Sequence, residues 1–237
     1  MKTPLAIQHQ FEFWTHIGQV GGYLYNNYGY TVLSPKNTTW PSKIFGIQKN
    51  HIAQLQLEIE SHHLPRSLAL SENEMLETLL HKQGFTRTSS VEAMTMEVKN
   101  QTHYTSLPEI EKITDDIGIK AFVKIASEAF GYTIYESTIA PLVRSTNVQL
   151  FLGNYQNDYV SCGIVFKDSN GDSGLHMIGA KKEYRGLGLG KKMTQHLLHI
   201  AISNSSERIH LVASKLGAPI YYKLGFQNRG YLKSYTF

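Results

Sequence analysis

The hydrophobic residues after position 108 change their spacing from one segment to the next. Val148, Leu150 and Leu152 alternate with polar residues, which is the pattern of a half-buried strand. Between residues 191 and 203 the apolar positions recur every three or four residues, which predicts an amphipathic helix. The other predicted elements are strands at 110–113, 159–166, 174–180, 209–214 and 226–237, and helices around 122–129, 134–143 and 219–223. This order predicts a mixed α/β fold.

Residues 1–100 predict the same kinds of element in a less regular order. The predicted helices are 11–20, 51–61 and a helix that ends near His81, and the predicted strands are 30–33, 44–47, 67–70 and 94–98. Ser71-Glu72-Asn73-Glu74 matches a capping box with Ser71 as the N-cap residue of the third helix. The polar segment 101–108 interrupts the periodicity, so we expect two domains, 1–104 and 105–237.

The composition is typical of a packed soluble protein, with 41% hydrophobic and 11% aromatic residues in 237. No apolar run reaches the roughly 18 residues of a membrane helix, and the first residues lack the apolar core of a signal peptide. The single cysteine, Cys162, lies in an apolar strand-like run, so we expect a buried thiol. These features favour a cytoplasmic protein that has no membrane partner.

The net charge is only +4, and the basic residues form no long block, so we expect no nucleic acid partner. Five of them gather within twelve positions: Lys181, Lys182, Arg185, Lys191 and Lys192. Lysines in the first turn of a helix oppose its dipole unless an anion lies nearby. The cluster therefore favours an anionic ligand over a merely solvated helix start.

The segment Arg185-Gly186-Leu187-Gly188-Leu189-Gly190 joins a predicted strand to a predicted helix. Glycines let backbone N–H groups turn toward one point, and the helix N-terminus adds positive potential there, so the loop can hold a phosphate or pyrophosphate. A P-loop would need glycine at Arg185 and Ser or Thr at Lys192. The dinucleotide pattern G-x-G-x-x-G also fails, because its last position falls on Lys191 or Met193.

The loop instead matches R-x-x-G-x-G, and a second segment follows it. Residues 217–226 (GAPIYYKLGF) resemble A-x-x-L-Y-x-K-L-G-F, with Gly217 in place of alanine and Ile220 in place of leucine. With these two segments, residues 108–237 resemble the GCN5-related N-acetyltransferase (GNAT) superfamily. The resemblance implies an α/β (α+β) GNAT fold, a central, mostly antiparallel mixed sheet flanked by helices.

Part of this second segment recurs in the first half of the chain. Residues 79–85 (LLHKQGF) are similar to residues 222–226, but nothing in residues 1–104 corresponds to R-x-x-G-x-G. This predicts two tandem halves, a degenerate GNAT-like N-terminal domain and a catalytic C-terminal domain. The alternative is an ordinary helix C-cap followed by a core aromatic residue.

The resemblance implies acetyl-CoA as co-substrate, with no metal. The backbone N–H groups of the glycine loop would hold the pyrophosphate, and Arg185 would add a charged donor. The end of the preceding strand would pair with the pantetheine arm, and Ser214 stands where relatives carry an asparagine that contacts it. The implied coenzyme A contacts are Met177, Ile178, Gly179, Ala180, Arg185, Gly186, Leu187, Gly188, Leu189, Gly190, Lys191, Ser214 and Tyr221.

Two residues are candidates for proton transfer. Tyr221 matches the family tyrosine that protonates the coenzyme A thiolate, whereas Tyr222 is one residue out of register. Many relatives carry a glutamate on the strand before the loop, but that strand holds no carboxylate here. His176 is therefore the candidate base, and a structural strand histidine is the alternative. Asp172 is a poorer candidate, and an acceptor that arrives neutral needs no base.

These residues predict an N-acetyltransferase acting on a primary amine of a small molecule, amino acid or peptide. The alternative is a non-catalytic acyl-CoA-binding sensor or assembly module. We expect the acceptor to be recognised near Phe130, Tyr132, Tyr135 and Glu136, although helical packing also explains Phe130. The sequence leaves the oligomeric state open between monomer and homodimer.

Overall fold

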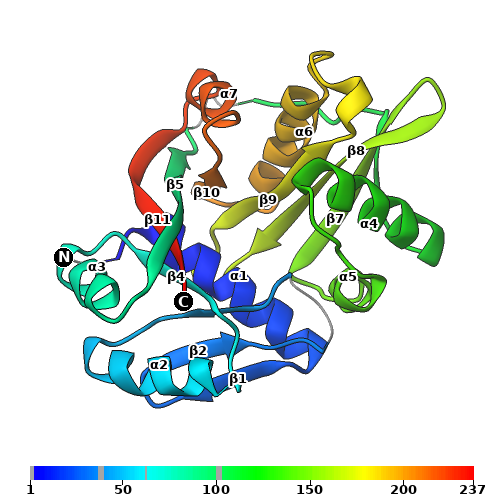
Figure 1. Ribbon diagram of the computed structural model, residues 1–237. Coiled ribbons are helices and arrows are strands. Elements are labelled where there is room, and N and C mark those ends of the chain that lie inside the picture. Colours follow the sequence, from blue (N-terminus) through cyan, green and yellow to red (C-terminus); the bar gives the residue numbers. More distant parts are fainter. Residues whose placement is uncertain (1–2, 37–39, 62, 100–102) are drawn as a thin grey trace. The chain divides into compact units, whose positions relative to one another are not determined.

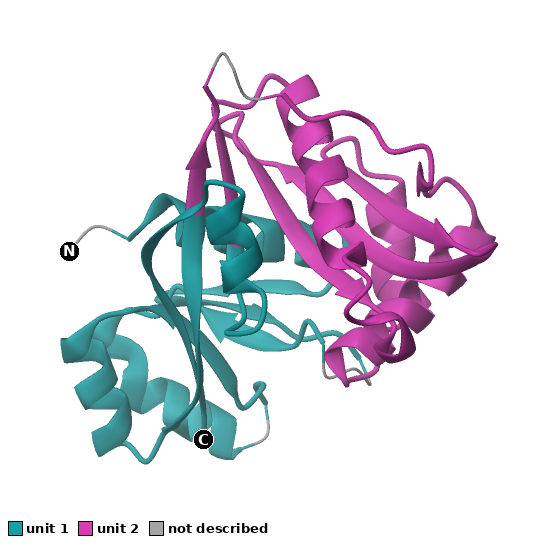
Figure 2. Cartoon of the chain, turned by 90° about the horizontal axis from the view of Figure 1, so that it is seen from above, with its two compact units in different colours: residues 1–94, 212–237 teal, residues 95–211 magenta. Residues whose placement is uncertain are grey.

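The computed structural model describes residues 3–36, 40–61, 63–99 and 103–237 (Figure 1). The chain divides into two compact units, residues 1–94 with 212–237 (unit 1) and residues 95–211 (unit 2), which Figure 2 shows in different colours. Residues 101 and 102 of the predicted domain boundary lie outside the described residues. The described helices are not long and apolar enough to cross a membrane.

Unit 2 is a sheet with helices on both faces. Its elements are β6 (Ile110–Lys112), α4 (Asp116–Phe130), α5 (Glu136–Val143), β7 (Val148–Tyr155), β8 (Asp158–Lys167), β9 (Ser173–Ala180), the 3-10 turn η2 (Lys182–Tyr184), α6 (Leu189–Ser203) and β10 (Arg208–Ala213). The strand order is β10-β9-β8-β7-β6, in which β9 and β10 run parallel and the other pairs antiparallel. The predicted fold class, a mixed and mostly antiparallel sheet flanked by helices, is confirmed.

The centre of this sheet is buried on both faces because a helix covers each of them. A Cβ on Gly163 of β8 would meet Met193 and Leu197 of α6, so this face of the strand lies against α6. The neighbouring residue Cys162 points to the opposite face, since successive strand residues alternate. There its sulfur lies close to Gly179, which in turn packs on Ala129 of α4. This placement explains the continuous apolar run in β8.

Unit 1 has the same kind of layering. Its elements are α1 (Leu5–Gly21), β1 (Leu24–Asn27), β2 (Tyr30–Leu33), β3 (Lys43–Phe45), the 3-10 turn η1 (Lys49–His51), α2 (Ile52–Glu60), β4 (Ser67–Ser71), α3 (Glu74–Lys82), β5 (Thr86–Glu97), α7 (Ala218–Lys223) and β11 (Gln227–Thr236). The strand order is β1-β2-β3-β4-β11-β5, with β3 and β4 parallel. Ile44 joins a core with α2 and α3, whereas its neighbour Phe45 packs on Trp14 of α1.

The last strand of each half of the sequence contributes to the other compact unit. β11 pairs with β4 of unit 1 from Leu232↔Ser71 to Thr236↔Ser67. Residues 95–97 of β5 belong to unit 2, where Thr95 Oγ1 and Nδ1 of His210 in β10 lie 3.0 Å apart. The compact units therefore do not follow a cut at residue 104. The predicted domains, 1–104 and 105–237, were two halves of the sequence with the same fold. The compact units do not test this division, so it stays a prediction.

Two strands of the first half differ from the sequence-based expectation. β1 was not predicted, because its segment LYNN offers no apolar alternation. β5 begins at Thr86, eight residues before the predicted start, and Thr86 to Ser90 are all exposed. A solvent-facing stretch of Thr, Arg and Ser carries no hydrophobic pattern, so pairing with other strands decides its conformation.

The predicted N-cap of the third helix is wrong by two residues. Asn73 caps α3, and its Oδ1 accepts a hydrogen bond from the Leu76 N–H at 3.0 Å. Glu77 completes the cap, since its Oε1 accepts from the Asn73 N–H at 3.1 Å. Ser71 is instead the last residue of β4, where it pairs with Leu232 of β11. Ser71 therefore belongs to β4 and not to the cap of α3.

Replacing Asn73 by alanine is expected to lower the free energy of unfolding by about 1 kcal/mol, because the Leu76 N–H loses its acceptor. Ser71→Ala is the matched control and should change it by less than about 0.5 kcal/mol. Urea denaturation followed by circular dichroism measures both. A larger loss of unfolding free energy in Ser71→Ala than in Asn73→Ala would instead support Ser71 as the N-cap residue.

Candidate functional site

The glycine loop between β9 and α6 adopts a conformation that requires glycine at two positions. Gly186 has a φ of 86° and Gly188 a φ of 76°, both in the left-handed region. A residue with a Cβ pays roughly 1–2 kcal/mol for this region, whereas glycine adopts it freely. A Cβ on Gly186, Gly188 or Gly190 would meet no atom within 4 Å. All three glycines therefore face open space.

The loop ends at the N-terminus of α6, which has no side-chain cap. Gly188 is the N-cap residue, and the first turn of the helix contains no acidic residue. The N–H groups of the first helical turn have no acceptor within the helix, because the first backbone bond of this kind runs from Lys192 N to Gly188 O at 3.0 Å. Together with the helix dipole, these groups form an anion site.

The C-terminal end of α4 anchors the loop from the side. The Arg185 guanidinium donates through Nη2 to the Ala129 carbonyl at 3.2 Å, and this carbonyl belongs to the last turn of α4. The Lys182 N–H donates to Glu128 Oε1 at 2.8 Å. Neither contact is predictable from the sequence, because more than fifty residues separate the partners and no local pattern connects them.

The five basic residues of the segment are not equivalent. Lys192 is paired with Glu109, with Nζ and Oε1 3.0 Å apart. The Lys181 ammonium lies over the Tyr184 ring, 6.0 Å from its centroid. Lys191 and Arg185 are exposed at the two ends of the glycine loop. We therefore expect Arg185 and Lys191, which flank the loop, and the exposed Lys182 to supply most of the charge that an anion at the loop would meet.

β9 contains a bulge that the sequence did not reveal. Cys162 of β8 pairs with Gly179, but Ile164 pairs with His176, so β9 has one extra residue between these pairs. Met177 lies there with a φ of 49°, a strained value for a residue with a Cβ. The parallel pairs of β9 with β10 end at Gly174. The implied pantetheine contacts, Met177–Ala180, therefore lie beyond the last residue of β9 that pairs with β10.

Three titratable residues in and around β9 are buried: His176, Cys162 and Asp172. His176 is 5% exposed, and its ring packs on Phe166 with centroids 6.4 Å apart. This placement favours the structural role that the sequence left open for His176. The expected burial of Cys162 is confirmed, and burial raises the pKa of its thiol to about 12. Asp172 is 3% exposed and accepts from Arg208 Nε at 2.9 Å, so it holds β9 to β10.

Two of the aromatic residues expected to recognise the acceptor, Phe130 and Tyr132, lie together. Phe130 and Tyr132 stack with ring centroids 6.0 Å apart, and Phe130 lies beside Gly179 of β9. Phe130, Tyr132 and Tyr135 are each about 40% exposed, at 37%, 39% and 42%. Glu136, the first residue of α5, is also exposed. Phe130 therefore packs on β9 with part of its ring and exposes the rest to solvent.

Ser214 and Tyr221 belong to unit 1. Ser214 Oγ accepts from the Gly217 N–H at 3.2 Å. The Tyr221 ring packs edge-on against Phe226 at 5.9 Å, and burial raises the pKa of its phenol to about 12. A Cβ on Gly217 would lie 3.1 Å from the Tyr221 ring. The absent alanine methyl at Gly217 therefore leaves room for this ring.

Tyr222, the neighbour that the motif register excludes, has a different environment. Its hydroxyl donates a short hydrogen bond to Glu92 of β5, and Asn228 Nδ2 donates to the same carboxylate at 3.0 Å. Tyr222 is 47% exposed. Its phenol is thus tied to a structural partner, which suits Tyr222 as the control for Tyr221.

Comparison with known proteins agrees with this arrangement. Residues 119–226 match the model of the acetyltransferase (GNAT) family. None of the curated proteins matches the sequence. Among solved structures, the chain is similar to a GCN5-related N-acetyltransferase from Kribbella flavida (16% identity, 99% of this chain and 96% of that chain, TM-score 0.72).

Two further structures share the fold. One is a putative acetyltransferase of the GNAT family from Novosphingobium aromaticivorans (12% identity, 94% of each chain, TM-score 0.63). The other is a tandem GNAT protein from the clavulanic acid biosynthesis pathway (11% identity, 88% of this chain and 78% of that chain, TM-score 0.59). The glycine loop and the bulged strand both lie within residues 119–226, the part of this chain that matches the model of the acetyltransferase (GNAT) family.

Proposed function

We propose that this protein is an acetyl-CoA-dependent N-acetyltransferase that acts on a primary amine of a small molecule, amino acid or peptide, in the cytoplasm. The observation that carries the proposal is the uncapped N-terminus of α6 behind two left-handed glycines. Its N–H groups and the exposed Arg185 suit a pyrophosphate, and the open space at all three glycines leaves room for one. The residues present therefore fit acetyl-CoA, which supplies the acetyl thioester when bound.

Each of the other implied residues has one role in this proposal. The bulged segment Met177–Ala180 aligns the pantetheine arm through its backbone, and Ser214 adds one hydroxyl contact. The Tyr221 phenol stays protonated near neutral pH because burial raises its pKa to about 12, and it donates a proton to the leaving thiolate. Phe130, Tyr132 and Glu136 orient the amine beside Gly179. A base is needed only for an acceptor that arrives protonated.

The alternative, an acyl-CoA-binding sensor without catalysis, keeps one supporting observation. His176 is buried against Phe166, and the strand before the loop holds no carboxylate. A panel of primary amines assayed for thiol release with acetyl-CoA separates the two functions. Release with at least one amine supports the transferase, whereas silence across the panel with confirmed acetyl-CoA binding supports the sensor.

Acetyl-CoA is expected to raise the melting temperature, because a ligand that binds only the folded state stabilises it. At 100 times the dissociation constant the gain is about 2.7 kcal/mol. ATP is the control, since the loop lacks the first glycine and the Ser or Thr of the P-loop pattern. Differential scanning fluorimetry measures both shifts. An equal shift with ATP would indicate a general nucleotide site and contradict the proposed donor.

A further inference from the structure

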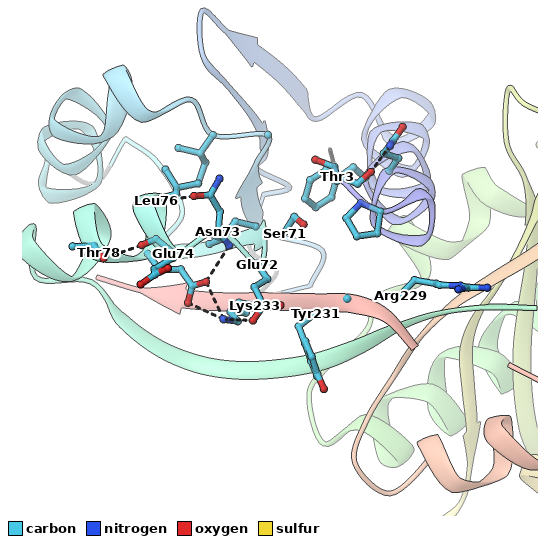
Figure 3. Close-up of a pocket in the computed structure, with 18 of the residues that line it drawn as sticks. Thr3, Ser71, Glu72, Asn73, Glu74, Leu76, Thr78, Arg229, Tyr231 and Lys233 are labelled. Atoms are coloured by element: carbon cyan, nitrogen blue, oxygen red, sulfur yellow. Dashed lines mark hydrogen bonds and ion pairs between the residues drawn. The ribbon is translucent and has the colours of Figure 1, made fainter. Parts of the chain in front are cut away.

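Unit 1 contains a cavity that none of the donor or acceptor residues lines. Its volume is about 1010 Å³. The walls come from the start of α1, the ends of β3 and β4, the first turns of α3 and one side of β11 (Figure 3). All of these segments belong to unit 1. The cavity is large enough for a small molecule.

The position of this cavity in the sheet is one that favours ligands. β3 and β4 run parallel, and among the described residues they pair at Ile44↔Leu68. The cavity is lined by Gly46 and Ile47, which follow β3, and by Leu70 and Ser71, which end β4. In open α/β sheets, ligands bind outside the carboxyl ends of strands. β9 and β10 of unit 2 separate in the same way beside the glycine loop.

Carboxylates define the chemistry of the cavity. Glu72, Glu74 and Glu77 all line it. Glu77 accepts from Lys233 Nζ through both oxygens, at 2.9 and 3.0 Å, and from the Tyr235 hydroxyl at 2.8 Å. Glu72 Oε1 lies 3.0 Å from the same Nζ, and its side chain remains 51% exposed. The site thus already holds one ammonium group, that of Lys233, between two carboxylates.

The side chains that line the cavity carry more negative than positive charge. Burial would lower the pKa of Lys233, but Glu77 and Glu72 outweigh it and raise the value, so this side chain stays charged. The Arg229 side chain extends away from Glu72 and Glu74 in Figure 3. Within the described part of the chain, Glu74 has no cationic partner and is exposed. Glu74, and the exposed half of Glu72, which also pairs with Lys233, are therefore the carboxylates that a second cation can reach.

The remaining walls suit the carbon skeleton of an organic cation. Phe11, Ile47, Leu70 and Leu76 line the cavity, and Pro4 and Tyr231 extend its apolar surface. The described residues contain no group of three His, Cys, Asp or Glu side chains arranged to hold a metal ion. A phosphate is disfavoured by the three carboxylates. An organic amine fits both kinds of lining residue, because its ammonium group can pair with the carboxylates and its apolar body can contact the hydrophobic side chains.

We propose that the cavity at the carboxyl ends of β3 and β4 binds a small primary amine with an apolar body, whose ammonium group pairs with Glu72 and Glu74. This site lies in unit 1 and differs in its residues from the acceptor cluster of Phe130 to Glu136. The proposal does not rest on the proposed function, because binding is measured without acetyl-CoA.

The test is calorimetric titration of the full chain with 2-phenylethylamine, tyramine and hexylamine. We expect at least one amine to bind, and 2-phenylethanol, which lacks the charge, to bind at least tenfold more weakly. The double variant Glu72→Gln/Glu74→Gln should weaken amine binding roughly tenfold or more, since each substitution removes a charged acceptor. Both side chains are exposed, so the fold should persist, which the circular dichroism spectrum checks.

Two controls keep the result specific to this cavity. Glu60→Gln removes an exposed carboxylate of α2 that does not line it and should leave affinity unchanged. Glu136→Gln, in the acceptor cluster, should reduce only the amine binding that persists in the double variant Glu72→Gln/Glu74→Gln. The proposal is overturned if no amine binds below about 10 mM, if the double variant binds as well as the original protein, or if only Glu136→Gln abolishes binding. Acetyl-CoA binding should be the same in all variants.

Discussion

Replacing Tyr221 by phenylalanine is expected to lower the maximal rate of acetyl transfer by roughly 100-fold or more. General acid catalysis contributes about 10²- to 10⁴-fold, and the substitution removes only the proton that the thiolate would receive. The phenol is neutral near pH 7 because burial raises its pKa to about 12, so the change alters no charge. Affinity for acetyl-CoA should therefore remain nearly unchanged. Steady-state kinetics with free-thiol detection measures the rate, and calorimetry the affinity.

Tyr222→Phe is the matched control, because it removes the neighbouring hydroxyl on the same helix. That hydroxyl is bonded to Glu92, so its loss should affect stability slightly and leave the rate within about twofold. Since the pKa of Tyr221 is raised, its acid form persists as the pH increases toward 12 and should cause no loss of rate below about pH 11. A Tyr221→Phe variant with an unchanged rate would remove Tyr221 as the acid.

The sequence predicted the elements around the donor loop well because their apolar faces pack locally. β8 is buried on both faces, and α6 buries Met193 and Leu197 against it, so both segments carry a strong hydrophobic period. The loop itself was readable for a different reason. Left-handed φ values at Gly186 and Gly188 strongly favour glycine, so the glycines themselves indicate the conformation of the loop.

Features that depend on distant partners were not readable. The Met177 bulge arises from the pairing of β9 with β8, and methionine carries no preference for a left-handed φ. The contacts of Arg185 and Lys182 with the end of α4 join segments more than fifty residues apart. The exchange of last strands between the compact units likewise depends on long-range pairing, which no local pattern indicates.

The glycines of the donor loop should separate into two classes when each is replaced by alanine. Gly188 has a φ of 76°, so Gly188→Ala should strain the loop by roughly 1–2 kcal/mol. Gly190 lies within α6, where alanine is favoured over glycine by roughly 0.5–1 kcal/mol. Thermal denaturation of the protein without ligand should therefore show a lower melting temperature for Gly188→Ala and a higher one for Gly190→Ala.

Acetyl-CoA affinity should fall in both variants, for different reasons. In Gly188→Ala the N–H groups no longer converge, and a strain of this size corresponds to a loss of roughly tenfold. In Gly190→Ala the loop keeps its shape, but the methyl group enters the open space that lies beside the first N–H groups of α6. A variant that is more stable and yet binds acetyl-CoA roughly tenfold more weakly would show that a ligand approaches the backbone at Gly190. Unchanged affinity in Gly190→Ala would mean that the pyrophosphate does not lie against this turn, and the donor site would then have to be sought elsewhere along β9.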